Sequence, residues 1–149
     1  PILHWQLTAF STRQLDINAW SDLRPFKVGY ERGMTIIAEH SELNLLPANS
    51  IESAILQASM GRVDVLLNDD FTTRYNLRRM GVENLIANPT PLAPGPAFHL
   101  LNSKHQKLAE QLNEVLLEMT ANDRIRQIKD EVIEDFMRKA EQEYRQEQP

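Results

Sequence analysis

Two carboxylates at the end of a short apolar segment are the residues of this sequence best placed to do chemistry. Val63–Leu67, interrupted only by Asp64, has the composition of a buried strand, and Asp69 and Asp70 follow it where a helix is expected to begin. In an open α/β sheet, ligands bind outside the carboxyl ends of the strands. One aspartate is expected to cap the helix and the other to face the site. A free carboxylate there would hold an ammonium group through charge-assisted hydrogen bonds.

A second strand is expected to end in a complementary way. Phe26–Tyr30 is followed by Gly33, Met34 and Thr35 and then by an apolar helix. The N-terminus of a helix offers unpaired N–H groups and a partial positive charge, which suit a carboxylate. A simpler interpretation stays open, in which Gly33 only provides an unusual backbone angle and Thr35 caps the helix. Together with Asp69, these strand ends would form a receptor for a zwitterion such as an amino acid.

Composition narrows the remaining function classes. The chain has 149 residues, a net charge of −5 and no cysteine, so a nucleic-acid interface, disulfides and thiolate metal sites are not expected. No phosphate-binding loop, dinucleotide-binding glycine motif or serine nucleophile elbow is present. No apolar run approaches the length of a membrane span, and no signal peptide is visible, which indicates a cytosolic chain, a mature chain or a fragment. The histidines do not have the spacing of metal ligands; they are His4, His40, His99 and His105. We therefore expect no catalytic residue, no metal and no cofactor.

The expected strands and helices alternate and then give way to a helix pair. Right-handed βαβ units around a mainly parallel sheet are predicted between residues 26 and 87. Asn88–Pro96 holds four of the eight prolines and is predicted to be a stiff connector. Two amphipathic helices follow, the first beginning at Ser103 with Gln106 in a capping box, and the first 100 residues offer them no obvious partner. The strands are predicted at Leu3–Phe10, Phe26–Tyr30, Leu43–Leu46 before Pro47, Val63–Leu67, Val82–Ala87 and Ala97–Leu101, with helices over 34–40, 51–60 and 70–80.

Three segments carry a family resemblance. They are DLRPFKVGYERG at 22–33, SAILQASMGRVDVLLND at 53–69, and the region Phe98–Met119. The first resembles the DLkGkkVgvqkGt segment, and the second the ealqaLlaGrvDavvxD segment, of type II periplasmic solute-binding proteins. Within that class they resemble family 3, the amino-acid-binding receptors of ABC transporters. Met34 departs from the family pattern, which has Ser or Thr directly after the glycine.

The resemblance implies a fold and a set of site residues. The implied fold class is α/β, a periplasmic-binding-protein-like lobe with a mainly parallel sheet flanked by helices, plus a C-terminal helix pair. Residues 1–96 would form the second, ligand-binding lobe with a crossover strand. Residues 97–149 would form a return segment and helices that pack on a first lobe in relatives, and the N-terminal part of that lobe has no counterpart here. Asp69 would hold the ligand ammonium, Gly33, Met34 and Thr35 would meet its carboxylate, and Asn68 would line the crevice wall.

The implied function is binding without catalysis. We expect a periplasmic protein that binds a small polar solute such as an amino acid by closure of two lobes, and that serves an ABC permease. A second copy of the chain, or the missing lobe, is expected to cover the C-terminal helices. One alternative is a sensor or orphan receptor domain of the same fold that is not coupled to transport. A less favoured alternative is a dehydratase-like enzyme, in which Asp69 or Asp70 would act as a general acid.

Overall fold

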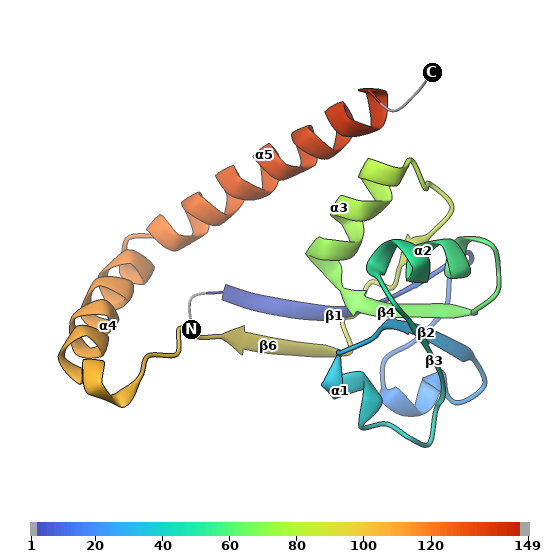
Figure 1. Cartoon of the computed structure of the whole chain (residues 1–149), viewed down its shortest axis with the longest axis horizontal. Helices are drawn as coiled ribbons and strands as arrows, with labels where there is room; N and C mark the ends of the chain where they lie inside the picture. The colour runs from blue at the N-terminus through green and yellow to red at the C-terminus, as the bar shows by residue number, and fades with distance from the viewer. Residues whose placement is uncertain (1–2, 147–149) are drawn as a thin grey trace.

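A computed structural model describes residues 3–146 as a lobe built on one sheet, followed by two long helices (Figure 1). Within these residues no helix is long and apolar enough to cross a membrane. In chain order the elements are β1 (Leu3–Ser11), the 3-10 helix η1 (Trp20–Leu23), β2 (Lys27–Glu31), α1 (Thr35–Ala38), β3 (Asn44–Ala48), α2 (Ile51–Ser59), β4 (Val65–Asp69), α3 (Asp70–Met80), β5 (Ile86–Ala87), β6 (Ala93–Ala97), the 3-10 helix η2 (Ser103–His105), α4 (Gln106–Ala121) and α5 (Arg124–Gln146).

The sheet is mixed, with the order β3-β2-β4-β1-β5 and with β6 also paired to β1. Strand β2 lies parallel to β3 and β4, whereas β1 runs antiparallel to β4, β5 and β6. The predicted α/β fold class is confirmed, and the parallel pairing is confined to the strands β2, β3 and β4. Parallel neighbours need a crossover connection, and only the α1 and α2 segments provide one inside the sheet.

Both faces of the sheet are buried, which explains the continuous apolar run in β4. Side chains alternate along a strand, so Val65 and Leu67 point to one face and Leu66 to the other. The first face forms a core with Leu7 and with Ile37 of α1. The second face lies under α2 and α3 in a core of Phe10, Ala48, Ile51, Ala54, Ile55, Ala58, Val63, Leu66 and Leu85.

Only the first half of the proline-rich segment is a connector, because Ala93–Pro96 belong to β6 whereas residues 88–92 have no regular structure. Strand β6 pairs along β1, with Pro94 opposite Gln6 and Pro96 opposite His4. Proline fits an edge strand because its missing N–H falls on the unpaired side. The strand predicted at Ala97–Leu101 was wrong, since β6 ends at Ala97 and residues 98–102 have no regular structure.

Several predicted boundaries move by a few residues. Pro47 lies inside β3 instead of closing it, because β3 is at the edge of the sheet. The helix predicted over 34–40 is reduced to α1, and the strand predicted at Val82–Ala87 is reduced to β5. The cap expected at Ser103 belongs to Asn102, whose side chain accepts a hydrogen bond from the amide of Lys104 at 3.1 Å.

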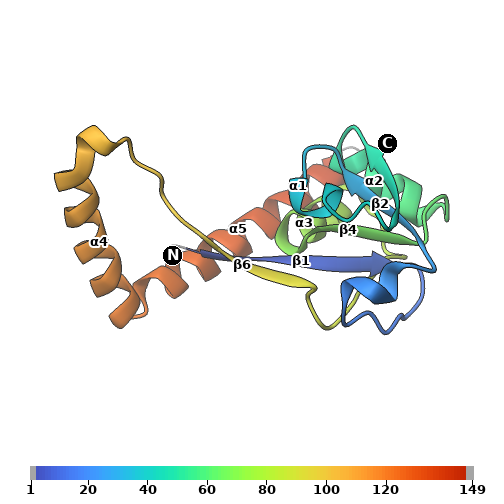
Figure 2. The same ribbon diagram turned by 90° about the horizontal axis from the view of Figure 1, so that it is seen from below.

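The last helix packs on the lobe, contrary to the expectation that nothing in the first 100 residues would receive it. Figures 1 and 2 show α5 running back from α4 to lie along α3. The ring of Phe136 meets Phe71 and Tyr75 edge to face, with ring centroids 6.1 and 5.9 Å apart. Ala140 is fully buried in this contact. Sequence alone could not match these side chains because they lie more than 60 positions apart.

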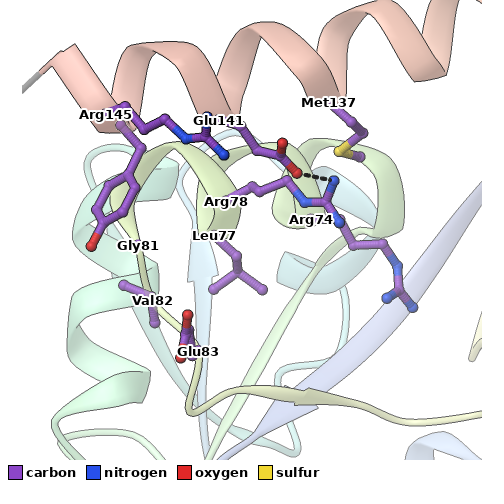
Figure 3. Close-up of a pocket in the computed structure, with 10 residues that line it drawn as sticks. Arg74, Leu77, Arg78, Gly81, Val82, Glu83, Met137, Glu141 and Arg145 are labelled. Carbon is purple, nitrogen blue, oxygen red and sulfur yellow. Dashed lines mark hydrogen bonds and ion pairs between the residues drawn. The ribbon is translucent and has the colours of Figure 1, made fainter.

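A cavity of about 600 Å³ lies between α3 and the end of α5 (Figure 3). Arg78 donates a hydrogen bond to Glu141 across it, at 2.8 Å. Helix α4 stands apart from the sheet and packs against α5 (Figure 2). Exposed apolar side chains lie along α4 and the segment before it; they are Phe98, Leu100, Leu101, Leu108, Leu112, Val115 and Leu117.

Candidate functional site

The two aspartates after β4 have different roles. Asp69 caps α3: its Oδ1 accepts hydrogen bonds from the amide and the hydroxyl of Thr72, both at 2.8 Å. Asp70 is the first residue of the helix, and its Oδ2 pairs with Arg74 Nε at 2.8 Å. Asp69 Oδ2 has no hydrogen-bond partner in the described part of the chain. The aspartate that caps the helix is therefore also the one with an oxygen left for a ligand.

Asn68 lies beneath Asp69 and is only 2% exposed. Its Oδ1 accepts a hydrogen bond from the backbone amide of Asp69 at 2.8 Å, so it fixes the backbone that carries the capping carboxylate. Thr8 lies opposite Asn68 in the β1–β4 ladder and is equally buried. Within residues 3–146, Thr8 Oγ1 and Asn68 Nδ2 find no hydrogen-bond partner. Buried polar atoms left unpaired cost about 1–3 kcal/mol each, and functional sites are where proteins tolerate such costs.

The turn between β2 and α1 has the conformation that its glycine permits. Gly33 has a φ of 103°, which side-chain-bearing residues rarely adopt. Met34 is the N-cap of α1 and makes no side-chain capping bond, so Thr35 is not the cap. The Met34 amide is donated to the carbonyl of Glu31 at 3.3 Å. Among the turn residues expected to meet a ligand carboxylate, Met34 therefore has its amide already paired inside the chain.

The sheet brings the two predicted strand ends to one edge. Strands β2 and β4 are parallel neighbours, with Tyr30 opposite Leu67, so the Gly33–Thr35 turn and Asp69 leave the sheet on the same side. The two groups differ in surroundings, because Gly33 and Thr35 are exposed whereas Asp69 is half-buried. The predicted site residues are thus neighbours at the strand ends, as a receptor for one ligand requires.

Asp69 also lines a cavity of about 450 Å³ that sequence reasoning did not find. Apart from Asp69, His4 and Lys129, its lining is apolar. None of its lining residues belongs to the Gly33–Thr35 turn. The cavity is open to solvent on one side. It is lined by β1, the end of β4, the start of α3, the end of β6, the end of α4 and the first half of α5, with the lining residues His4, Trp5, Asp69, Phe71, Ala97, Leu116, Met119, Ile125, Ile128, Lys129, Val132 and Ile133.

Comparison with known proteins gives matches of fold. An arginine 3rd transport system periplasmic binding protein from Legionella pneumophila matches with a TM-score of 0.61 at 20% identity, over 88% of this chain and 62% of that one. The GluR0 ligand-binding core in complex with L-glutamate matches with a TM-score of 0.65 at 19% identity, over 93% and 61%. A histidine kinase sensor domain with similarity to periplasmic binding proteins matches with a TM-score of 0.63 at 18% identity, over 86% and 58%.

The chain therefore spans less than two thirds of the length of each of these structures. No protein-family model and no curated protein matches the sequence. At these identities the likeness concerns architecture, and it agrees with the resemblance drawn from the residues. The chain has the fold of a lobe of the type II periplasmic binding proteins, followed by two helices.

Proposed function

We propose that this chain is the ligand-binding lobe of a periplasmic solute-binding protein that binds a small polar solute such as an amino acid. The observation that carries the proposal is the geometry of Asp69. Its carboxylate stands at the carboxyl end of β4, is oriented by Thr72 through one oxygen, and keeps the other oxygen for a donor. An ammonium group is the complementary ligand chemistry. In this proposal Gly33 and Thr35 meet the rest of the ligand from the neighbouring strand end, and Asn68 supports Asp69 from below.

The neighbours in fold support binding over catalysis. They include a periplasmic binding protein of an arginine transport system and a ligand-binding core that holds L-glutamate. By analogy, this lobe closes with a second lobe over the ligand, and the closed form is presented to an ABC permease. Residues 1–96 form the lobe in this view, and residues 97–149 form the return segment and its helices. Closure requires only that the ligand binds the closed form better than the open one.

The proposal includes a further lobe that covers α4. The chain spans less than two thirds of the matched structures, and α4 carries exposed apolar side chains such as Leu108 and Val115. Exposed apolar patches of this kind favour association. Light scattering at high protein concentration measures the oligomeric state of the chain. A dimer would show that a second copy covers α4, and a monomer at all concentrations would contradict the need for a cover.

Thermal unfolding with pooled amino acids and small carboxylates tests the proposed binding. A ligand at a hundredfold excess over its Kd stabilises the native state by about 2.7 kcal/mol, which raises the midpoint. Asp69→Asn should abolish the shift from an amine-bearing ligand while keeping the cap, because Asn caps helices as well as Asp does. Asp70→Asn is the matched control, since it removes the same charge from the next residue and should keep the shift. Equal shifts in wild type and Asp69→Asn would contradict the ammonium role.

A sensor domain is the second candidate function. It is favoured by the match to a histidine kinase sensor domain and by the 23-residue helix α5, which reaches from the binding end of the lobe along α3. Uptake of labelled ligand by cells that carry or lack the gene distinguishes a transport function from a sensing function. Lost uptake supports transport, whereas unchanged uptake with a lost transcriptional response supports sensing.

A further inference from the structure

We infer that the C-terminal helices form part of the ligand site itself, and that the ligand is an α-amino acid with a large apolar side chain. This rests on the proposed function, because it uses the same Asp69 carboxylate as the ammonium partner. It adds the cavity that the lobe alone does not contain. Apolar walls with few polar groups and a volume of about 450 Å³ are typical of small-molecule sites.

The walls of this cavity favour a ligand with an apolar side chain. Phe71, from the first turn of α3, lines the cavity on the side of the lobe. Opposite it, Ile125, Ile128 and Val132 are spaced three and four residues apart and share one face of α5. A guanidinium or a second carboxylate placed among these side chains would lose its hydration without gaining a partner. An aromatic or branched aliphatic side chain would instead gain from burial.

The two charged groups of opposite sign fit the backbone of an amino acid. Asp69 is the anion in the cavity lining, and its carboxylate is fixed by the cap that Oδ1 makes with Thr72. Lys129 is the cation; it is exposed on α5 and forms no ion pair within residues 3–146. His4 lies on β1 beside the same cavity. An ammonium at Asp69 and a carboxylate at Lys129 would leave the side chain of the ligand among the apolar walls.

This inference differs from the proposed function in one contact, because it assigns the ligand carboxylate to Lys129 in place of Gly33 and Thr35. The turn lies at the same sheet edge but does not line the cavity, and its Met34 amide is already donated to Glu31. A flexible lysine side chain can reach a carboxylate as a point charge. Selectivity between ligands then depends on the apolar walls of the cavity and not on the turn.

Calorimetric titration of the full chain with L-phenylalanine, L-leucine, L-arginine and L-glutamate tests the inference. Phenylalanine or leucine should bind tightest, and Asp69→Asn should lower that affinity about tenfold or more. Ile128→Ala should lower it by about tenfold, because three buried carbons are lost. Leu117→Ala is the matched control and should leave it unchanged, since Leu117 is 62% exposed on α4 and does not line the cavity.

A second comparison isolates Lys129 without disturbing the fold, because its side chain is exposed. Lys129→Gln should lower the affinity for phenylalanine severalfold. It should leave the affinity for phenethylamine, which lacks the carboxylate, unchanged. Tight binding of arginine or glutamate that Ile128→Ala leaves intact would overturn the inference while keeping the proposed function. An equal loss of affinity for phenylalanine and for phenethylamine in Lys129→Gln would overturn the carboxylate role of Lys129. No binding of any of these ligands would overturn both proposals.

Discussion

Replacing Phe136 with alanine should detach the second half of α5 from the lobe. The residue is 43% exposed, so more than half of its surface is covered, and the Phe71 and Tyr75 rings pack against it edge to face. A large aromatic ring buries 150–250 Å² when it is fully enclosed, so roughly 100 Å² is removed from water here. At about 25 cal/mol per Å², that burial contributes about 2.5 kcal/mol, and each edge-to-face pair adds about 0.5–1.5 kcal/mol. Because such sums are upper estimates, we expect a loss of about 2–3 kcal/mol.

Urea unfolding followed by circular dichroism measures this loss. With a slope of about 2 kcal/mol per M, the midpoint should fall by roughly 1–1.5 M. Hydrogen exchange locates the effect, because the amides around Ala140 should lose protection while those of β4 keep it. Leu117→Ala on α4 serves as the control, since its side chain is 62% exposed. An unchanged midpoint, together with α5 amides that exchange freely in the wild type, would refute the packing of α5 on α3.

Three further changes test individual contacts. Asp69→Ala should lower the free energy of unfolding by about 1 kcal/mol through loss of the α3 cap, and Asp69→Asn should leave urea unfolding near wild type. Gly81→Ala should lower the free energy of unfolding by about 1–2 kcal/mol, since Gly81 has a φ of 64° and faces the Tyr144 ring. Adding Tyr144→Ala should restore only the part of this loss that comes from the clash with the ring. The pKa of Glu52 lies below its ordinary value, chiefly because its carboxylate accepts a hydrogen bond from its own backbone N–H. Its stabilisation is therefore complete above the unfolded pKa and lost as pH falls through the lower folded pKa, and Glu52→Gln should flatten the midpoint against pH between about pH 3 and 6.

The local features of the fold could be predicted from the sequence because each depends on a few adjacent residues. The apolar run Val63–Leu67 predicted a buried strand, and the structure confirms it with bounds shifted to Val65–Asp69. The pair Asp69 and Asp70 predicted a helix start with one capping carboxylate. The identity of the capping residue depends on how the backbone leaves β4, and that angle is fixed by the surrounding sheet.

The remaining features depend on partners far along the chain. Pro94 and Pro96 argue against a strand by local preference, and they form one because β1 pairs with them on the side that needs no proline N–H. The apolar stripe of α5 was visible in the sequence, but its partner was not, because Phe71 and Phe136 are brought together only by the path of the whole chain. The cavity beside Asp69 has the same origin, since six separate elements contribute to it.

Helix α3 contacts both the proposed ligand cavity and the last helix, α5. Its N-cap Asp69 and its first-turn residue Phe71 line the cavity, and its outer face contacts α5 through Tyr75 and Arg78. The second half of α5 is thus fixed on α3 while its first half lines the cavity, so loss of the Phe136 contact should move the cavity wall as well as lower stability. Phe136 itself does not line the cavity. Weaker phenylalanine binding in Phe136→Ala would therefore show that α5 acts as one rigid wall, whereas unchanged binding would show that the two halves of α5 are independent.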